Sequence, residues 1–208
     1  MNHSEDRARI AAYYDRLVEK YGHEPQAADA SSAASLEVRY GALGEVGDLS
    51  NKAILDVGCG FGGLGAYLRK QYPKLDYTGI DISSLMIVEG RRVYPDLRIN
   101  HKNVLDLPPE PTYDVVLAQG IFYLLEGDTE IKAYKLIRQM FALAKEAVAF
   151  SALSTWAERH TAGEFYIDPD KLLVWCRQLT SRLVLRHDYH PGDVCVYMYK
   201  GIQYEWTK

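Results

Sequence analysis

Residues 53–65 read AILDVGCGFGGLG, a run of β-forming residues followed at once by five glycines within eight positions. The first part is typical of a buried strand, and the second is typical of a sharp turn into a helix. Glycine is required where φ is positive or where a Cβ atom would strike a ligand. The stretch therefore predicts a strand, loop and helix whose backbone lies close to a bound molecule.

The glycine spacing leaves two classes of ligand open. Gly58, Gly60 and Gly63 form the GxGxxG pattern of dinucleotide sites, whereas Gly58, Gly60 and Gly62 form GxGxG. Asp81, in the stretch YTGIDIS, suits both classes, because an acid at this place accepts hydrogen bonds from the ribose hydroxyls of any adenosine cofactor. The loop and Asp81 together predict an adenosine cofactor.

Three further features favour a nucleoside that carries an amino acid. Asp56 lies two residues before Gly58, where its carboxylate would repel a pyrophosphate but would attract an α-ammonium group. The Tyr-x-x-x-Lys pair of short-chain dehydrogenases occurs only at residues 204–208. The turn HPGD, residues 190–193, is too short for a helical crossover, so the two strands around it must be antiparallel.

Strands alternate with helices from Lys52 onward, which predicts parallel strands covered by helices on both faces. The expected strands cover residues 53–57, 76–80, 97–101, 113–119, 146–153, 182–189 and 194–200. The expected helices between them cover residues 63–71, 83–94, 128–145 and 169–178. The predicted fold is a doubly wound, seven-stranded, mostly parallel α/β sheet that ends in an antiparallel hairpin.

The first 50 residues have a different pattern. Ser4 can cap an amphipathic helix that stops at Gly22, and a second helix is expected at residues 36–46. The joint between them is rich in Ala and Ser. We expect residues 1–50 to form a helical lid on a single structural domain, with residues 51–208 forming its cofactor-binding part.

Composition excludes several classes of function. The chain of 208 residues has a net charge of −4 and no Lys/Arg run longer than two, so a nucleic-acid substrate is not expected. Its three cysteines have no disulfide or zinc spacing, which suits a reducing, cytoplasmic location. No stretch approaches the roughly 18 apolar residues of a membrane span, and the charged N-terminus differs from a signal peptide.

The motifs DVGCGFG, IDIS, NVLDLP and YDVVLAQ, in this order, resemble those of the class I S-adenosylmethionine-dependent methyltransferases. The resemblance covers residues 52–151 well and the remainder only by its strand pattern. It implies S-adenosylmethionine as cofactor, S-adenosylhomocysteine as product and a small-molecule methyl acceptor. It does not identify the acceptor.

The resemblance also implies roles for residues of the first two motifs. Gly58 and Gly60 would face the methionine part of the cofactor, and Asp56 would support this loop and the ammonium group. Asp81 would bind the ribose. Arg39, on the second helix, would reach the methionine carboxylate.

For the adenine, the resemblance implies Ile82 and Met86 as packing residues. In the third motif it places Asn103 rather than Asp106 at the position that contacts the base. The Asn103 amide oxygen would accept from the exocyclic amine, and the Val104 N–H would meet a ring nitrogen.

Gln119 ends the fourth strand and would face the crevice between cofactor and acceptor. At this place the sequence has neither the NPPY motif of enzymes that methylate base amines nor the Asp of metal-dependent, catechol-type enzymes. No metal is therefore predicted.

The candidate catalytic residues are chosen by position alone. His190 or His160 could act as the base for an oxygen or nitrogen nucleophile, whereas Tyr14, Tyr123 and Trp156 could wall an apolar pocket. Two other functions remain open at this point: a non-catalytic subunit that binds S-adenosylmethionine, and an NAD-type oxidoreductase.

Overall fold

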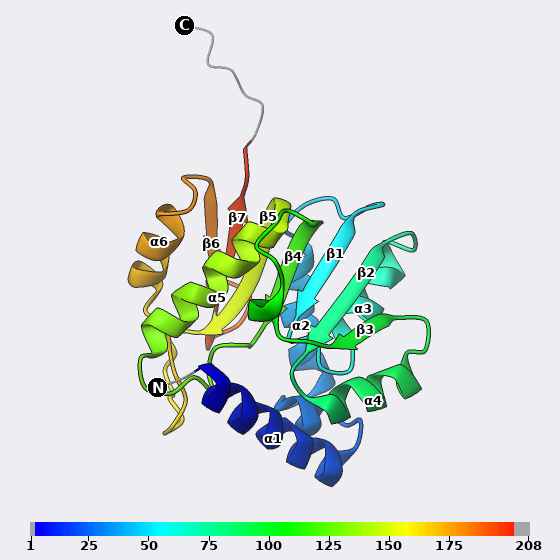
Figure 1. Ribbon diagram of the computed structural model, residues 1–208. Coiled ribbons are helices and arrows are strands. Elements are labelled where there is room, and N and C mark those ends of the chain that lie inside the picture. Colours follow the sequence, from blue (N-terminus) through cyan, green and yellow to red (C-terminus); the bar gives the residue numbers. More distant parts are fainter. Residues whose placement is uncertain (1–2, 202–208) are drawn as a thin grey trace, which may run out of the picture.

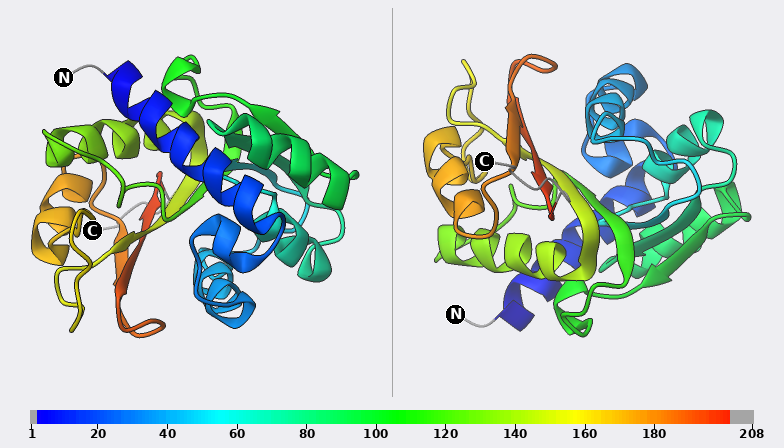
Figure 2. Two further views of the ribbon diagram at one scale, coloured as in Figure 1. Left: turned by 90° about the horizontal axis from the view of Figure 1, so that it is seen from below. Right: turned by 90° about the horizontal axis from the view of Figure 1, so that it is seen from above.

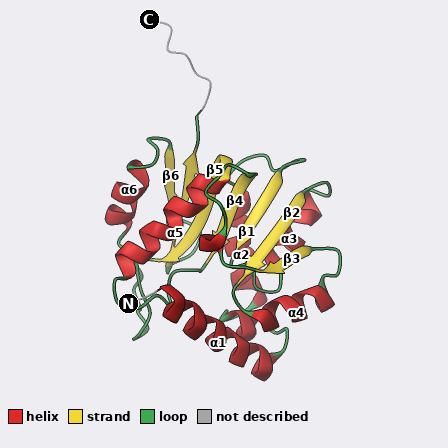
Figure 3. Ribbon diagram, in the orientation of Figure 1, coloured by secondary structure: helices red, strands yellow, loops and turns green. Residues whose placement is uncertain are grey.

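The computed structural model describes residues 3–201, which form a seven-stranded sheet flanked by helices (Figures 1 and 3). The strands are β1 (Ala53–Val57), β2 (Asp76–Asp81), β3 (Arg98–His101), β4 (Tyr113–Gln119), β5 (Ala144–Leu153), β6 (Leu183–Arg186) and β7 (Asp193–Tyr199). The α-helices are α1 (His3–Tyr21), α2 (Ala33–Gly44), α3 (Gly63–Gln71), α4 (Ser84–Val93), α5 (Thr129–Leu143) and α6 (Pro169–Arg177). Two short 3-10 helices are η1 (Pro25–Ala28) and η2 (Val104–Asp106).

The strand order is β3-β2-β1-β4-β5-β7-β6, which confirms the predicted doubly wound sheet. Strands β1 to β5 are parallel to their neighbours among themselves, while β7 is antiparallel to both β5 and β6. The chain reverses its direction of winding between β1 and β4. Ligands of such sheets bind beyond the carboxyl ends of the strands at this reversal.

Helices cover both faces of the sheet, as predicted. On one face α5 and α6 bury Ile137, Met140 and Leu172 against the strands. On the other face α2 and α3 bury Leu43 and Leu68. Since both faces are covered, the central strands are mostly apolar on both sides, and residues 54–57 of β1 and 115–118 of β4 are buried.

Several element boundaries differ from the sequence predictions. The second helix begins earlier than expected, at Ala33, because the Ser32 hydroxyl accepts a hydrogen bond from the Ser35 N–H and caps it. Strand β5 also begins earlier, because Ala144 already pairs with Tyr113 of β4.

The joint between the first two helices is more ordered than its composition suggested. It contains η1, whose Ala27 is fully buried and lies with Phe61 and Met86 in a small apolar cluster. Asp29 follows η1 with a φ of 52°. Small side chains here allow close packing against the glycine loop.

Helix α1 runs across the carboxyl edge of the sheet, over the reversal point, with α4 and η1 beside it (Figure 2). It also contacts the segment after β4, where the Arg9 guanidinium donates to the Leu124 carbonyl. The site of interest therefore lies between this helix and the strand ends.

A tight contact under the glycine loop yields a stability prediction. A Cβ atom on Gly65 would lie 2.5 Å from Cζ of Tyr77, which is fully buried and donates a hydrogen bond to Asp56. We expect Gly65→Ala to lower the free energy of unfolding by about 1–3 kcal/mol in urea titrations. The control is Gly41→Ala in α2, where the added Cβ would lie 3.4 Å from the Tyr67 hydroxyl. Equal stability of both variants would contradict the packing argument.

Candidate functional site

A cavity of about 760 Å³ opens at the carboxyl ends of β1, β2, β4 and β5, beneath α1. Its walls come from α1, η1, α2, the loop after β1, the ends of these strands and the start of β7. Of the residues predicted from the sequence, those that line it are Tyr14, Arg39, Gly58, Gly60, Asp81, Ile82, Met86, Asn103, Val104, Gln119 and Tyr123. The fold thus gathers residues from α1, α2, the loop after β1, α4 and the segments at the ends of β2, β3 and β4 at one site.

The glycine loop is anchored on the neighbouring strand β2. The N–H groups of Gly58 and Cys59 both donate to the Ile80 carbonyl, at 2.8 and 3.0 Å. Gly58 has a φ of 72°, and a Cβ atom there would collide with Ile121. The loop therefore requires glycine at this position, and its bare backbone forms the floor of the cavity.

Asp81 links the glycine loop to the end of β2. Its two carboxylate oxygens accept from the Gly60 N–H at 2.9 Å and from the Ser83 N–H at 2.8 Å. The side chain is largely buried, and burial raises its pKa, while these backbone hydrogen bonds act against that rise. Each oxygen keeps lone pairs for a ligand at the cavity wall, so this acid fits the predicted contact with ribose hydroxyls.

Asp56 lies beneath the loop and is not part of the cavity wall. It is 1% exposed, accepts a 2.6 Å hydrogen bond from the Tyr77 hydroxyl, and is absent from the lining. Burial raises its pKa to about 7. The prediction that it supports the loop fits this place, but direct contact with an ammonium group does not.

The residues predicted to contact adenine lie on the cavity wall. Met86 is 2% exposed and Val104 is 4% exposed, so both offer apolar packing surface. The Asn103 amide oxygen accepts from the Leu105 N–H at 3.0 Å, which orients the side chain at the start of η2. Asp106 instead lies outside the lining and pairs with Arg7 on the surface, in keeping with the choice of Asn103.

A chain of phenols joins α1 to the segment after β4. The hydroxyls of Tyr14 and Tyr123 lie 2.6 Å apart, and the Tyr123 hydroxyl also donates to Asp29 at 2.8 Å. Tyr13 donates to the same carboxylate oxygen, again at 2.8 Å. Burial raises the pKa of Tyr14. Tyr14 is therefore a neutral hydrogen-bonding group at the cavity wall.

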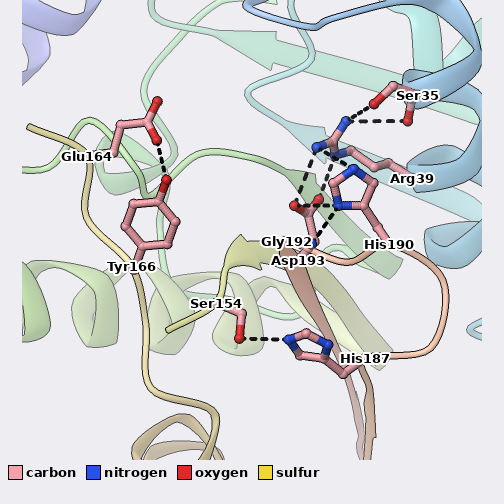
Figure 4. Close-up of polar contacts among 9 residues, drawn as sticks. All are labelled: Ser35, Arg39, Ser154, Glu164, Tyr166, His187, His190, Gly192 and Asp193. Carbon is pink, nitrogen blue, oxygen red and sulfur yellow. Dashed lines mark hydrogen bonds and ion pairs between the residues drawn. The ribbon is translucent and has the colours of Figure 1, made fainter. Parts of the chain in front are cut away.

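Arg39 lines the cavity, but its guanidinium pairs with Asp193 (Figure 4). Nε lies 2.5 Å from the Asp193 carboxylate, and other nitrogens contact Ser35 and His190. Binding of a methionine carboxylate would require some of these contacts to be exchanged, so the predicted role of Arg39 stays a prediction.

His190 lies behind this pair, outside the cavity lining. Its Nδ1 is 3.1 Å from Asp193, and burial lowers the pKa of the ring, which is therefore neutral at pH 7. A direct role as base would require the ring to reach past Asp193.

The remaining aromatic candidates divide between cavity and surface. Tyr123 lines the cavity, whereas His160 is exposed, stacks on Tyr166 with ring centroids 4.2 Å apart, and lies outside the lining. Trp156 is 54% exposed and also lies outside. The sequence placed both residues correctly after β5, but this loop turns them away from the cavity.

Polar cavity residues that the sequence analysis did not single out include Asp29, Ser151, Glu164 and Asp193. Ser151 lies two residues before the end of β5, and Asp193 closes the HPGD turn, so each is a polar residue near a strand end. That position was the available signal. Asp29 and Glu164 lie in connecting segments, and their sequence surroundings carry no comparable signal.

Within residues 3–201, no group of three or more His, Cys, Asp or Glu side chains is arranged to hold a metal ion. Over the same residues, every helix is too short or too polar to cross a membrane.

Comparison with known proteins gives matches in both sequence and fold. The family described as "Methyltransferase domain" matches residues 54–146. A Mycobacterium tuberculosis protein named "Putative methyltransferase Rv1506c" is 31% identical over 144 residues, which cover 66% of this chain and 86% of that protein.

Two further similarities are narrower or concern the fold alone. The trans-aconitate 2-methyltransferase of Escherichia coli is 32% identical over 80 residues, and the match spans 38% of this chain and 32% of that enzyme. The magnesium protoporphyrin IX methyltransferase of Synechocystis, crystallised with bound S-adenosylhomocysteine, has a TM-score of 0.66 at 15% identity. That match covers 94% of this chain and all of the other, so it shows the same fold.

The buried state of Asp56 yields a pH prediction. Its folded pKa of about 7 exceeds the ordinary aspartate value of 3.8, so between about pH 4 and 7 the folded protein keeps a proton that the unfolded chain loses. Stability from this group is present below pH 4 and is lost as the pH rises towards 7. Asp56→Asn cannot ionise and should gain stability over wild type by on the order of 2–4 kcal/mol across this window.

Urea unfolding at several pH values between 4 and 8 measures this difference. Asp96→Asn, at an exposed position, is the control and should differ from wild type by the same amount at every pH. A pH-independent difference for Asp56→Asn would show that Asp56 is ionised throughout.

Proposed function

Because the chain belongs to the class I S-adenosylmethionine-dependent methyltransferases, we propose that it methylates an oxygen or nitrogen atom of a small molecule. The observation that carries this proposal is the continuous cavity. It begins at Asp81 and the glycine loop, passes Gln119, and extends to Ser151 and Asp193 beyond the cofactor end. Such a cavity has room for an acceptor beside the cofactor, which favours an enzyme over a non-catalytic binding subunit.

The residues of the chain fit the cofactor. The glycine floor allows close approach of a nucleoside, and Asp81 presents a carboxylate where ribose hydroxyls would lie. Asn103 and the Val104 N–H would hold the adenine edge, with Ile82 and Met86 against its faces. When bound, S-adenosylmethionine supplies a methyl group already activated by its sulfonium.

The protein's part in the reaction is then alignment and exclusion of water. Ile10 of α1 and Ile121 and Leu125 after β4 add apolar surface to the wall of the cavity. Among the candidate catalytic residues, Tyr14 would face the methyl acceptor directly. His190 would influence the acceptor only through Asp193. We expect the reaction to take place in the cytoplasm. A nucleic-acid substrate is not predicted.

The cofactor proposal is tested by binding of S-adenosylhomocysteine in calorimetry and by methyl transfer across an acceptor screen. Asp81→Ala should weaken binding by on the order of a hundredfold, since hydrogen bonds from two ribose hydroxyls to a carboxylate are lost. Asp106→Ala, a surface acid outside the cavity, is the matched control and should bind as wild type. An unchanged affinity for Asp81→Ala would remove this residue from the site.

We further propose that residues 1–50 act as a movable cover, as the sequence suggested. Helix α1 lies over the cavity, where Ile10, Tyr14, Val18 and Tyr21 pack on apolar clusters. Its polar contacts include a buried ion pair between Asp6 and Lys132 and a 2.5 Å hydrogen bond from the Ser83 hydroxyl to Asp15. Polar contacts can be exchanged for water when the helix lifts, and closure would remove water from the reacting groups.

Hydrogen exchange tests the cover. The amides of residues 5–21 should gain protection when S-adenosylhomocysteine is added, whereas those of α5, which is packed on the sheet, should change little. Full protection of residues 5–21 in the free protein would mean that α1 is a permanent part of the core.

A further inference from the structure

The part of the cavity that is lined by Ser151, Glu164 and Asp193, which we call the acceptor half, contains a polar side chain without a partner. Ser151, two residues before the end of β5, is 1% exposed and lines the cavity, and its hydroxyl has no hydrogen-bond partner among residues 3–201. It pairs in register with Gln119 of β4, one strand further from the adenosine end. A buried hydroxyl left unpaired costs free energy unless a ligand satisfies it. Ser151 therefore marks a binding position beyond the cofactor.

The charged groups around this position are predominantly acidic. The Arg39 guanidinium has five N–H donors. Directed hydrogen bonds to Asp193 and to the carbonyl and hydroxyl of Ser35 use four of them, and the remaining N–H lies beside His190 Nε2. Because Arg39 and Asp193 carry opposite charges, the pair is neutral as a whole, and most of its donors are already used within the protein.

The other basic residues of the lining belong elsewhere. Arg7 pairs with Asp106 on the surface. Lys102 follows β3 and its N–H donates to the Asp81 carbonyl, which places it at the adenosine end. Lys70 lies in the last turn of α3, on the side of α2 and β2.

Glu164 supplies a carboxylate on the opposite side of the acceptor half. One of its oxygens accepts from the Tyr166 hydroxyl at 2.7 Å, and the Phe165 N–H donates to the Tyr123 carbonyl, which fixes this loop beside the cavity. Figure 4 shows the Glu164–Tyr166 pair apart from the Arg39 group. Among residues 3–201 no cationic side chain pairs with Glu164.

The phenol chain offers lone pairs to the same space. Because Tyr123 donates its single proton to Asp29, the short contact between the two phenols requires Tyr14 to donate to Tyr123. The Tyr14 oxygen then has only acceptor capacity left. A ligand at this wall must bring hydrogen-bond donors.

On these grounds we propose that the methyl acceptor is an amine whose N–H groups face Glu164 and Tyr14, with Ser151 bonding a second polar group of the same molecule. The proposal rests on the proposed function. An ammonium group supplies both the positive charge and the several donors that this wall requires, whereas a carboxylate supplies neither.

The acceptor nitrogen first gives one proton to the Glu164 carboxylate or to water. Its lone pair then forms the nitrogen–carbon bond while the sulfur–methyl bond breaks and leaves both electrons on sulfur. The products are the methylated ammonium and S-adenosylhomocysteine.

Calorimetry on the full chain saturated with S-adenosylhomocysteine tests this preference with matched probes. Two pairs share size and ring but differ in charge: tyramine against 3-(4-hydroxyphenyl)propionate, and histamine against imidazole-4-propionate. trans-Aconitate serves as an additional anion. We expect at least one amine to bind about tenfold or more tightly than its acid partner.

Two variants locate the preference. Glu164→Gln should abolish the difference between amine and acid, while Glu158→Gln, an exposed acid of the same connection, should leave it intact. Ser151→Ala should weaken amine binding without lowering the melting temperature, because its hydroxyl has no partner to lose in the protein.

Equal or weaker binding of every amine than of its acid partner, or an amine preference that survives in Glu164→Gln, would overturn the proposal. S-adenosylhomocysteine binding is recorded first, so its absence would contradict the cofactor assignment instead. The two failures are therefore distinguishable.

Discussion

Close contact between the glycine loop and β2 is the constraint on which the remaining structure depends. Two successive N–H groups, of Gly58 and Cys59, share the Ile80 carbonyl, and Gly60 donates to Asp81. Gly58 and Gly60 adopt φ values of 72° and 53°, which favour glycine, and a Cβ atom on Gly79 of β2 would lie 2.7 Å from the Cys59 sulfur. The same contacts position the Asp81 carboxylate at the cavity wall, so the turn that ends β1 also builds the cofactor site.

Buried charge is distributed unevenly around the cavity. Arg39 and Asp193 neutralise each other near the acceptor half, and Asp6 and Lys132 do the same beneath α1. Breaking either pair would leave a desolvated charge, which is strongly unfavourable. The carboxylates of Asp81 and Glu164 also line the cavity and have no cationic partner among the described residues. These two acids are the basis for the proposed contacts with ribose hydroxyls and with an amine.

Much of the fold could be predicted because local signals agreed with one another. The HPGD turn implied an antiparallel end to the sheet, and β7 is antiparallel to both of its neighbours. Helix α3 begins at Gly63 and ends at Gln71, as its pattern indicated. Predictions were weaker where packing overrides composition, as in the joint, where Ala27 is buried and η1 forms. His160 lies after β5, as predicted, but the path of this loop brings its ring to the surface, where it stacks on Tyr166.

The antiparallel end of the sheet, the glycine loop and the acid at the end of β2 could be predicted from the sequence. Each depends on a short pattern of residues that are adjacent in the chain. Tertiary structure alone decided the acceptor half. Arg39 meets Asp193 across 154 positions, and Tyr14 meets Tyr123 across 109. No local pattern encodes such pairs, since the sheet register and the path of α1 bring them together. Charge neutralisation at the site is therefore a property of the folded chain.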